Sequence, residues 1–305
     1  MKKRFIVLMV LLLAAVPLAA GPAKFSAEQA GDPAVFVKKN LSLDAKKLKK
    51  LGVKKLVILE CYGEYVTSKE VTDSVASQRS AMRTAASQGR MFYNVKTQVD
   101  TLELDKDYYT NTSNRVYQAI KEAFEANGIE IIGKEAVQQN EAYKTFNLEE
   151  EKAGRGVSSG VYKPTVVEKS QKVSTTGLGL FPGAIQMIKV VMNLGEITHS
   201  LGADGFLQVN FKVDKDKESR PVLEAFNVLL SADLRGQEVG FQGNKSMRYD
   251  FYIQWQPVVK LKSPLVATAE VLEGKKGPFN IEKYDAALME MLYAVTDGIK
   301  SEILK

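Results

Sequence analysis

The sequence has a single cysteine and a single histidine among its 305 residues. Cys61 alone cannot form an intrachain disulfide, and an exported chain without one suits a bacterial periplasm better than a eukaryotic secretory route. Cys61 and His199 together supply two ligands where a structural zinc site needs four, which excludes zinc sites of the usual type. We interpret His199, near the end of an apolar helix, as a cation facing the helix dipole rather than as a catalytic base.

Long apolar runs are missing after residue 20. Three basic residues at 2–4 precede an apolar run over 5–16 and the small-residue segment 17–20, which is the order of a secretory signal peptide. We expect cleavage after Ala20, with a retained anchor as the alternative. No cysteine follows the run to carry a lipid, and the apolar stretch around 185–194 is too short and interrupted to span a bilayer. The sequence therefore predicts a periplasmic protein without a transmembrane segment after signal cleavage.

A strong charge of one sign is also lacking. The chain has 42 Lys and Arg against 36 Asp and Glu, and three of the basic residues lie in the signal, so the mature chain carries about +3. We therefore expect no nucleic-acid partner. The lysines between 46 and 55 are interleaved with Leu48 and Leu51, which is typical of the solvated face of a short helix ended by Gly52.

No motif for catalysis, a cofactor or a metal is complete. The glycine-rich segments 154–160 and 177–183 lack the spacing of a dinucleotide or phosphate loop. Residues 214–218 resemble the start of a calcium loop but lack its later glycine and glutamate, so we interpret them as a charged hairpin turn. The consecutive carboxylates 149–151 point in different directions and make no acid-base pair. The sequence predicts no catalytic, cofactor or metal residues, and binding residues remain unknown.

The pattern of apolar residues predicts an α/β (α+β) fold with a mixed β-sheet, packed helices, long polar insertions and a C-terminal amphipathic helix. We expect a signal peptide over 1–20, a flexible arm over 21–40 and one domain over 41–305, with insertions at 67–104 and 147–180. The second insertion is interpreted as a mobile loop or an extended hairpin. Strands are expected at 55–66, 91–104, 129–132, 205–213, 222–234, 246–261 with a bulge or edge at Pro257, and 265–272; helices are expected from a cap at Thr112 or Ser113 to Gly128, and at 135–146, 184–201 and 281–304.

Four segments carry a resemblance to a known family: KKLVILECY at 54–62, RVYQAIKEAFEANGIEIIGKEAV at 115–137, HSLGADGFLQVNF at 199–211, and the strand-rich end before the last helix. They resemble the domain shared by the curli-secretion lipoprotein, the lipoprotein activator of penicillin-binding protein 1B and the amino-terminal domain of the Tol-system propeller protein. The likeness spans roughly 55–273 with large insertions. This chain departs from the two lipoproteins because it lacks their lipid-bearing cysteine.

The resemblance implies no catalytic residues and a role in cell-envelope assembly or secretion through contacts with envelope proteins. We therefore expect a periplasmic, non-enzymatic binding or scaffold protein whose function resides in the polar insertions. One alternative is a carboxylate-using hydrolase of envelope glycans, which would need two carboxylates about 5 to 10 Å apart in a cleft. Another is a carrier of a small apolar ligand. Three local expectations accompany the fold: Cys61 is buried, Gly202 caps a helix in the left-handed conformation, and Asp204 accepts local backbone donors.

Overall fold

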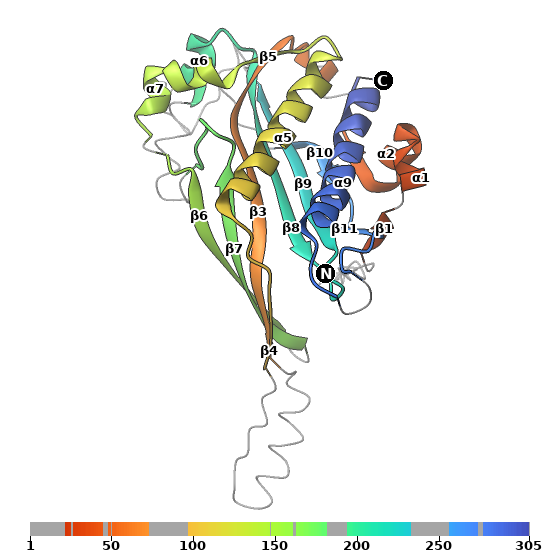
Figure 1. Cartoon of the computed structure of the whole chain (residues 1–305). Coiled ribbons are helices and arrows are strands. Elements are labelled where there is room, and N and C mark those ends of the chain that lie inside the picture. Colours follow the sequence, from red (N-terminus) through yellow and green to blue (C-terminus); the bar gives the residue numbers. More distant parts are fainter. Residues whose placement is uncertain are drawn as a thin grey trace, which may run out of the picture.

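The computed structural model describes residues 22–25, 27–44, 48–49, 51–72, 97–146, 148–160, 163–181, 194–232, 256–273 and 277–304. These residues form one mixed sheet whose long path runs β1-β11-β9-β8-β3-β7-β6, with β2, β4, β5 and β10 attached to its members. Helices α5 and α9 lie side by side across one face of this sheet (Figure 1). The α/β fold class predicted from the sequence is confirmed.

The strands are β1 (Ala23–Phe25), β2 (Leu41–Leu43), β3 (Lys55–Thr72), β4 (Thr97–Thr101), β5 (Glu130–Ile132), β6 (Glu151–Gly160), β7 (Lys163–Ser174), β8 (Gly205–Lys215), β9 (Pro221–Ala232), β10 (Gln256–Leu261) and β11 (Leu265–Ala267). The helices are α1 (Ala27–Ala30), α2 (Pro33–Asn40), α5 (Lys106–Glu125), α6 (Lys134–Gln139), α7 (Glu141–Lys144) and α9 (Ile281–Glu302). Residues 194–200 are also helical. None of the described helices combines the length and the apolar character needed to cross a bilayer.

Strand β3 is the centre of the sheet. Its first half pairs with β8 in parallel and with β5 in parallel, and its second half pairs with β7 and β4 in antiparallel fashion. Residues 56–59 and Cys61 are buried because the first half is covered on both faces. The α9 positions that the sequence places on one stripe, from Tyr284 to Ile303, are buried as well. Burying one large apolar side chain contributes about 1.5–3 kcal/mol to the free energy of folding. The apolar layer between the sheet and the helices is therefore the main source of stability.

The predicted flexible arm is wrong for the part of 21–40 that is described. β1 adds a parallel strand to β11, and α2 packs against α9. Phe25 and Phe36 are 3% and 1% exposed, and their rings meet edge to face at 6.2 Å. Proline suits the first turn of a helix, where Pro33 lies in α2, and Asp32 caps that helix by accepting from Val35 N.

Helix α5 begins earlier than the sequence predicts. Its cap is Asp105, which accepts from Asp107 N, whereas Thr112 and Ser113 lie inside the helix and are fully buried. The prediction was wrong because both hydroxyl groups find partners inside the fold: Thr112 Oγ1 donates to the Tyr108 carbonyl of the same helix, and Ser113 Oγ donates to the Val173 carbonyl of β7. The predicted helix end at 127–128 is confirmed, with left-handed Gly128. The predicted helix over 135–146 divides into α6 and α7 at Asn140, whose side chain caps α7.

The two predicted insertions continue the sheet. Residues 67–72 extend β3 and residues 97–101 form β4, while residues 73–96 lie outside the described part of the chain. The second insertion is the extended hairpin of β6 and β7, which confirms one of its two interpretations.

The remaining strand predictions agree with the described residues, except that β11 ends at residue 267 and not at 272, and the charged turn predicted at 214–218 lies two residues later because residues 214 and 215 continue β8. Residues 216–220 form the turn between β8 and β9. Pro257 lies at a register shift between β10 and β9, so the bulge interpretation holds. The predicted elements at 91–96, 184–193, 233–234 and 246–255 lie outside the described residues.

Candidate functional site

The two faces of the central strands have opposite character. Tyr65 of β3 stacks on Tyr109 of α5 with ring centroids 4.2 Å apart, so Tyr65 and its alternate neighbours point towards the helices. The intervening residues of β3 point to the other side of the sheet. The residues directly opposite them on the neighbouring strands point to that side too, because directly opposite residues share a face. This polar face carries Glu60, Tyr62, Glu64 and Lys69 on β3, Glu168, Ser170 and Lys172 on β7, Gln208, Asn210, Lys212 and Asp214 on β8, and Glu224 and Asn227 on β9.

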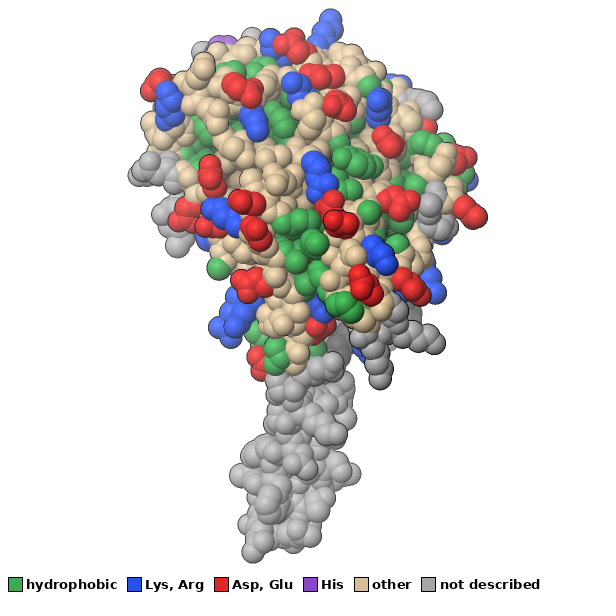
Figure 2. Space-filling model, viewed as in Figure 1, with side chains coloured by type: hydrophobic (Ala, Val, Ile, Leu, Met, Phe, Trp, Pro, Cys, Tyr) green, Lys and Arg blue, Asp and Glu red, His purple; other side chains and the backbone are tan. Residues whose placement is uncertain are grey.

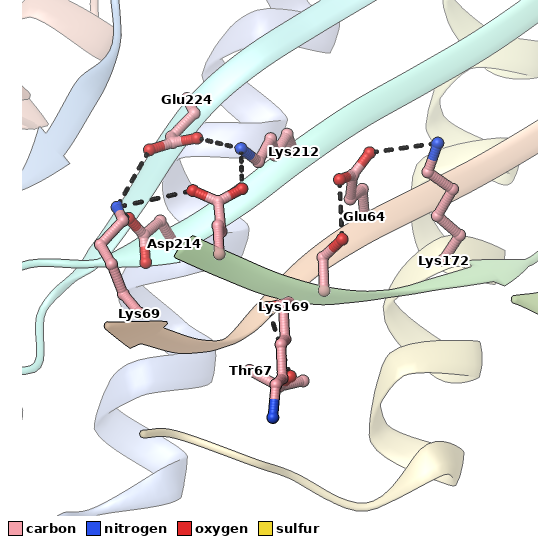
Figure 3. A network of polar contacts seen from close by, with 10 residues as sticks. Glu64, Thr67, Lys69, Lys169, Lys172, Lys212, Asp214 and Glu224 are labelled. Carbon is pink, nitrogen blue, oxygen red and sulfur yellow. Dashed lines mark hydrogen bonds and ion pairs between the residues drawn. The ribbon is translucent and has the colours of Figure 1, made fainter. Parts of the chain in front are cut away.

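Five charged side chains meet on the polar face, on the side of the sheet away from α5 and α9 (Figure 3). We call them the root cluster: Lys69, Glu168, Lys212, Asp214 and Glu224. Lys69 binds Asp214 closely and lies 3.7 Å from Glu168 and 3.8 Å from Glu224. Lys212 binds Glu168 closely and lies 2.8 Å from Glu224. Each ammonium group therefore bridges carboxylates from two or three strands.

Burial and pairing act against each other in this cluster. Burial alone would lower the pKa of Lys69 and Lys212, but their hydrogen bonds to Asp214, Glu168 and Glu224 outweigh it and raise both pKa values. The side chain of Asp214 is only 8% exposed, and this burial raises its pKa although Lys69 opposes the shift. Such a group is costly to leave without its partner, so the cluster is held together as a unit.

The root cluster lies where one neighbouring strand of β3 ends and another takes its place. β8 follows β3 as far as Tyr65 opposite Val213, and from Ser68 onwards β4 takes over the same edge of β3. Lys215, at the end of β8, binds Asp100 of β4. Lys69 and Glu168 come from the strands that continue past this point, whereas Lys212, Asp214 and Glu224 come from the strands that end there. The cluster therefore joins the body of the sheet to the part that projects from it.

A second polar group lies beside the root cluster. Glu64 accepts from Ser170 Oγ at 2.8 Å and lies 3.4 Å from Lys172 Nζ (Figure 3). Gly154 of β6 makes room for this contact, since a Cβ atom there would lie 2.3 Å from Ser170 Oγ. The pairing leaves Glu64 and Lys172 mutually compensated on the polar face.

Glu60 is another nearly buried carboxylate of this face, and it has no lysine in direct contact among the described residues. It is 7% exposed and accepts from Phe181 N at 2.6 Å and from Gln208 Nε2 at 2.9 Å. Burial raises its pKa from 4.5 to about 7, while the two hydrogen bonds and the charge of Lys172 act in the opposite direction. Glu60 thereby ties the segment before residue 182 to the centre of β3.

The carboxylates of the root cluster have the spacing of a metal site. One oxygen each from Glu168, Asp214 and Glu224 lies within 4.8 Å of the others. Two lysine ammonium groups already contact all three carboxylates at ion-pair distance, however, and offset two of their three charges. The arrangement is therefore that of an internal salt-bridge network, and nothing in its geometry favours a cation over the lysines.

The residues singled out in the sequence lie mostly outside this site. Cys61 is buried as predicted, and burial raises the pKa of its thiol to about 12. Residues 149–151 are exposed, and His199 lies on an exposed position of the helical segment that left-handed Gly202 ends. Asp204 caps distant rather than local donors: its carboxylate accepts from the backbone N–H groups of residues 54 and 55, at the start of β3.

Sequence reasoning missed the root cluster except for Asp214, which it placed in a turn. A signal is present in hindsight: Lys212 and Asp214 alternate with buried residues on β8, as Lys172 and Glu168 flank Ser170 on β7. Charges at every second position of a strand share one face, which indicates a charged sheet face. Lys212 pairs with Glu224 of the next strand, but the pairs of Lys69 with Asp214 and of Lys212 with Glu168 join strands 145 and 44 residues apart, so those pairs could not be read from the sequence.

Comparison with protein-family models, with curated proteins and with solved structures finds no match. The resemblance to the envelope domains stays a prediction.

Proposed function

We propose that this chain is an exported, periplasmic, non-enzymatic binding or scaffold protein of cell-envelope assembly or secretion. It acts through protein contacts made by the strands that project beyond the helices. The signal-like residues 1–20 support export, and the shape of the sheet supports the mode of binding (Figure 1).

The observation that carries the proposal is the projecting ribbon, which we define as β4 with residues 68–72 of β3, 163–169 of β7 and 155–160 of β6. Strand pairing places Val99, Glu70, Val167 and Val157 in one row across its four strands. Val99 and Val157 are 59% and 61% exposed, the two largest exposed fractions among the described large apolar residues that lie on the surface. Exposed β-branched side chains in one row form a surface that a partner can cover.

The root cluster gives this ribbon a fixed direction. A two-sided ribbon without helices on it has little apolar burial to hold it in place. Lys69 and Lys215 connect it by ion pairs to the ends of β8 and β9, so it is presented to a partner in a defined orientation. Prior ordering of a binding surface lowers the entropic cost of association.

The two alternatives have less support. A glycan hydrolase needs a free acid and a free base, whereas Glu168, Asp214 and Glu224 are held by lysines. A carrier needs space for its ligand between sheet and helices. In the described part of the chain, that layer is filled by the side chains of Phe211 and Phe226 together with those of α5 and α9.

The ribbon can be tested in intact cells. A photo-crosslinking amino acid placed at Val99 or at Val157 should capture a discrete envelope protein, and the same residue at Val35 should not. Val35 is a matched control because it is 50% exposed on α2, away from the ribbon. Equal capture from all three positions, or capture from Val35 alone, would show that the ribbon is not the binding surface.

Export is tested separately. We expect the protein to be recovered in the periplasmic fraction without detergent. Its intact mass should match that of a chain that begins at Gly21. Recovery of residues 1–20 in a membrane fraction would contradict periplasmic release.

Figure 2 shows the helix-covered side of the molecule, where acidic and basic side chains are interspersed. This surface has no extended region of one charge. It offers no electrostatic footprint for a polyanion, in keeping with a protein partner.

A further inference from the structure

A row of hydrogen-bond donors crosses the projecting ribbon next to its row of valines. Strand pairing places Thr101, Ser68, Lys169 and Arg155 directly opposite one another on β4, β3, β7 and β6. We call these four residues the donor row. It consists of two hydroxyl groups followed by two cations and contains no carboxylate. Thr101, Lys169 and Arg155 are exposed, so the row is open to a ligand that accepts hydrogen bonds.

The donor row lies on the face of the sheet that carries α5 and α9 farther along. Lys169 follows Glu168 and precedes Ser170, which both belong to the polar face, and successive residues of a strand point to opposite faces. Figure 3 shows Lys169 directed away from Glu64. On each of the four strands the donor row and the valine row lie two residues apart, so the two rows are neighbours on one face.

The two cations of the donor row are not compensated within the described part of the chain. Lys169 lies directly opposite Arg155, and like charges in this position destabilise a strand pair. Among the described residues, no acidic group lies within ion-pair distance of either cation. Glu70 is only a diagonal neighbour of Lys169, a separation of about 7–8 Å in an antiparallel pair. The row therefore lacks a carboxylate.

The polar face holds the same arrangement with its charge offset. There Lys152 of β6 lies directly opposite Lys172 of β7. Glu64 lies 3.4 Å from Lys172 Nζ and reduces the repulsion between the two lysines. In the donor row, a carboxylate from outside the chain would take the position that Glu64 takes on the polar face.

We propose that the donor row and the valine row together bind an acidic, apolar segment of the envelope partner. A carboxylate of that segment lies over Lys169 and Arg155, and its aliphatic side chains cover Val99 and Val157. Hydrogen bonds from arginine to a carboxylate are short and strong, and the apolar contact beside them excludes water. This inference rests on the proposed function and adds the chemistry of the partner.

An anionic membrane surface also offers acceptors to the donor row, but the ribbon favours a protein. Glu70 lies within the valine row, between Val99 and Val167, where a uniformly negative surface would repel it. Recruitment to anionic lipid takes clusters of roughly four to eight cations, and the donor row supplies only Lys169 and Arg155. A single carboxylate on a protein segment matches this pair without meeting Glu70.

Arg155→Glu and Lys169→Glu separate binding from stability. Each places a carboxylate directly opposite the remaining cation, which turns the repulsion between β6 and β7 into an attraction. We therefore expect a melting temperature equal to that of the parent or higher. Capture by a photo-crosslinking amino acid at Val99 should nevertheless fall about tenfold in each variant, because the new carboxylate neutralises the remaining cation and repels the acidic segment. Val99 is a suitable reporter because it lies on β4, across the ribbon from β6.

Lys152→Glu is the matched control. It changes the charge of β6 by the same amount at an exposed position, but this position lies on the polar face, opposite Lys172. We expect both the capture at Val99 and the melting temperature to stay close to those of the parent.

The captured material reports the chemistry of the partner directly. Mass spectrometry of the adduct formed at position 157 of the otherwise unchanged protein should show a partner peptide. We expect Asp or Glu within about two residues of its attachment point, because Arg155 of the donor row lies two residues from Val157 along β6.

Two results would overturn this inference and leave the ribbon proposal standing. One is capture that is unchanged in both Arg155→Glu and Lys169→Glu. The other is a partner peptide without acidic residues near the attachment point. A lower melting temperature in both variants, together with lost capture, would assign the cations to the fold and would also overturn it. A phospholipid adduct in place of a peptide, or no capture by the parent, would contradict the proposed function and this inference with it.

Discussion

The two faces of the central sheet are built from the same strands but are stabilised by different interactions. Towards the helices, Phe211, Phe226 and Tyr65 form a ring cluster with centroids 5.9 to 6.3 Å apart. On the polar face the neighbouring positions of the same strands hold Lys212 and Glu64 in ion pairs. Apolar packing is insensitive to pH and salt, whereas pairs of charges are not. The comparison indicates that packing on the helix side stabilises the fold, whereas the ion pairs of the polar face hold the projecting ribbon in its orientation.

The largest effect is expected on the helix side. Phe211→Ala removes a side chain that is 1% exposed and packs on two other rings, and it should lower the free energy of unfolding by about 3–5 kcal/mol. Denaturant unfolding of the purified variant measures this loss. A loss below about 1 kcal/mol would show that the helix side is not the main source of stability.

The next effect concerns Glu60 and its dependence on pH. Its pKa is raised from 4.5 to about 7 in the folded chain, so its contribution to stability is present below pH 4.5 and is lost as the pH rises through about 7. Glu60→Gln should therefore stabilise the protein at pH 8, by roughly 1–3 kcal/mol, and should flatten the decline of stability between pH 5 and pH 8. An identical pH profile for both proteins would contradict this assignment.

A smaller effect is expected from Lys69→Met, which leaves the nearly buried Asp214 without its closest cation. The loss should be about 1–2 kcal/mol in the free energy of unfolding. Lys144→Met is the control, because the Lys144–Glu141 pair at 2.7 Å is 51% and 88% exposed and should contribute about 0.5 kcal/mol or less. Equal losses for the two variants would remove the distinction between the root cluster and an ordinary surface pair.

The smallest effect should be a shift in titration. The charge of Lys172 lowers the pKa of Glu60, so Lys172→Ala should move the midpoint of the Glu60 titration upwards by less than about one pKa unit. Carboxyl chemical shifts followed against pH measure this midpoint. A downward movement would mean that Lys172 does not act on Glu60 through its charge.

The sequence predicts the helix side better than the polar face. The apolar stripe of α9 and the strand around Cys61 follow from local periodicity, and the structure agrees; the turn between β8 and β9 was predicted two residues too early. The start of α5 and the order in 23–40 were missed although local caps at Asp105 and Asp32 mark both helices; the packing of α2 on α9 and of Ser113 on β7 could not be read from the sequence.

The polar face could not be assembled from the sequence for a similar reason. Apart from the Lys212–Glu224 pair within the β8–β9 hairpin, the ion pairs of the root cluster join strands that are far apart along the chain, as Lys69 and Asp214 are. The long hairpins were interpreted as insertions because their composition is polar. They are strands whose pairing is given by backbone hydrogen bonds and not by an apolar pattern.

The central claim is that the root cluster fixes the projecting ribbon to the body of the sheet. Amide hydrogen exchange in the parent and in Lys69→Met tests it most directly. We predict faster exchange at residues 68–72, 97–101 and 165–169, with the amides of β8 and β9 between 206 and 211 and between 226 and 230 unchanged. Exchange that is equally fast throughout the sheet, or unchanged in the ribbon, would contradict the claim.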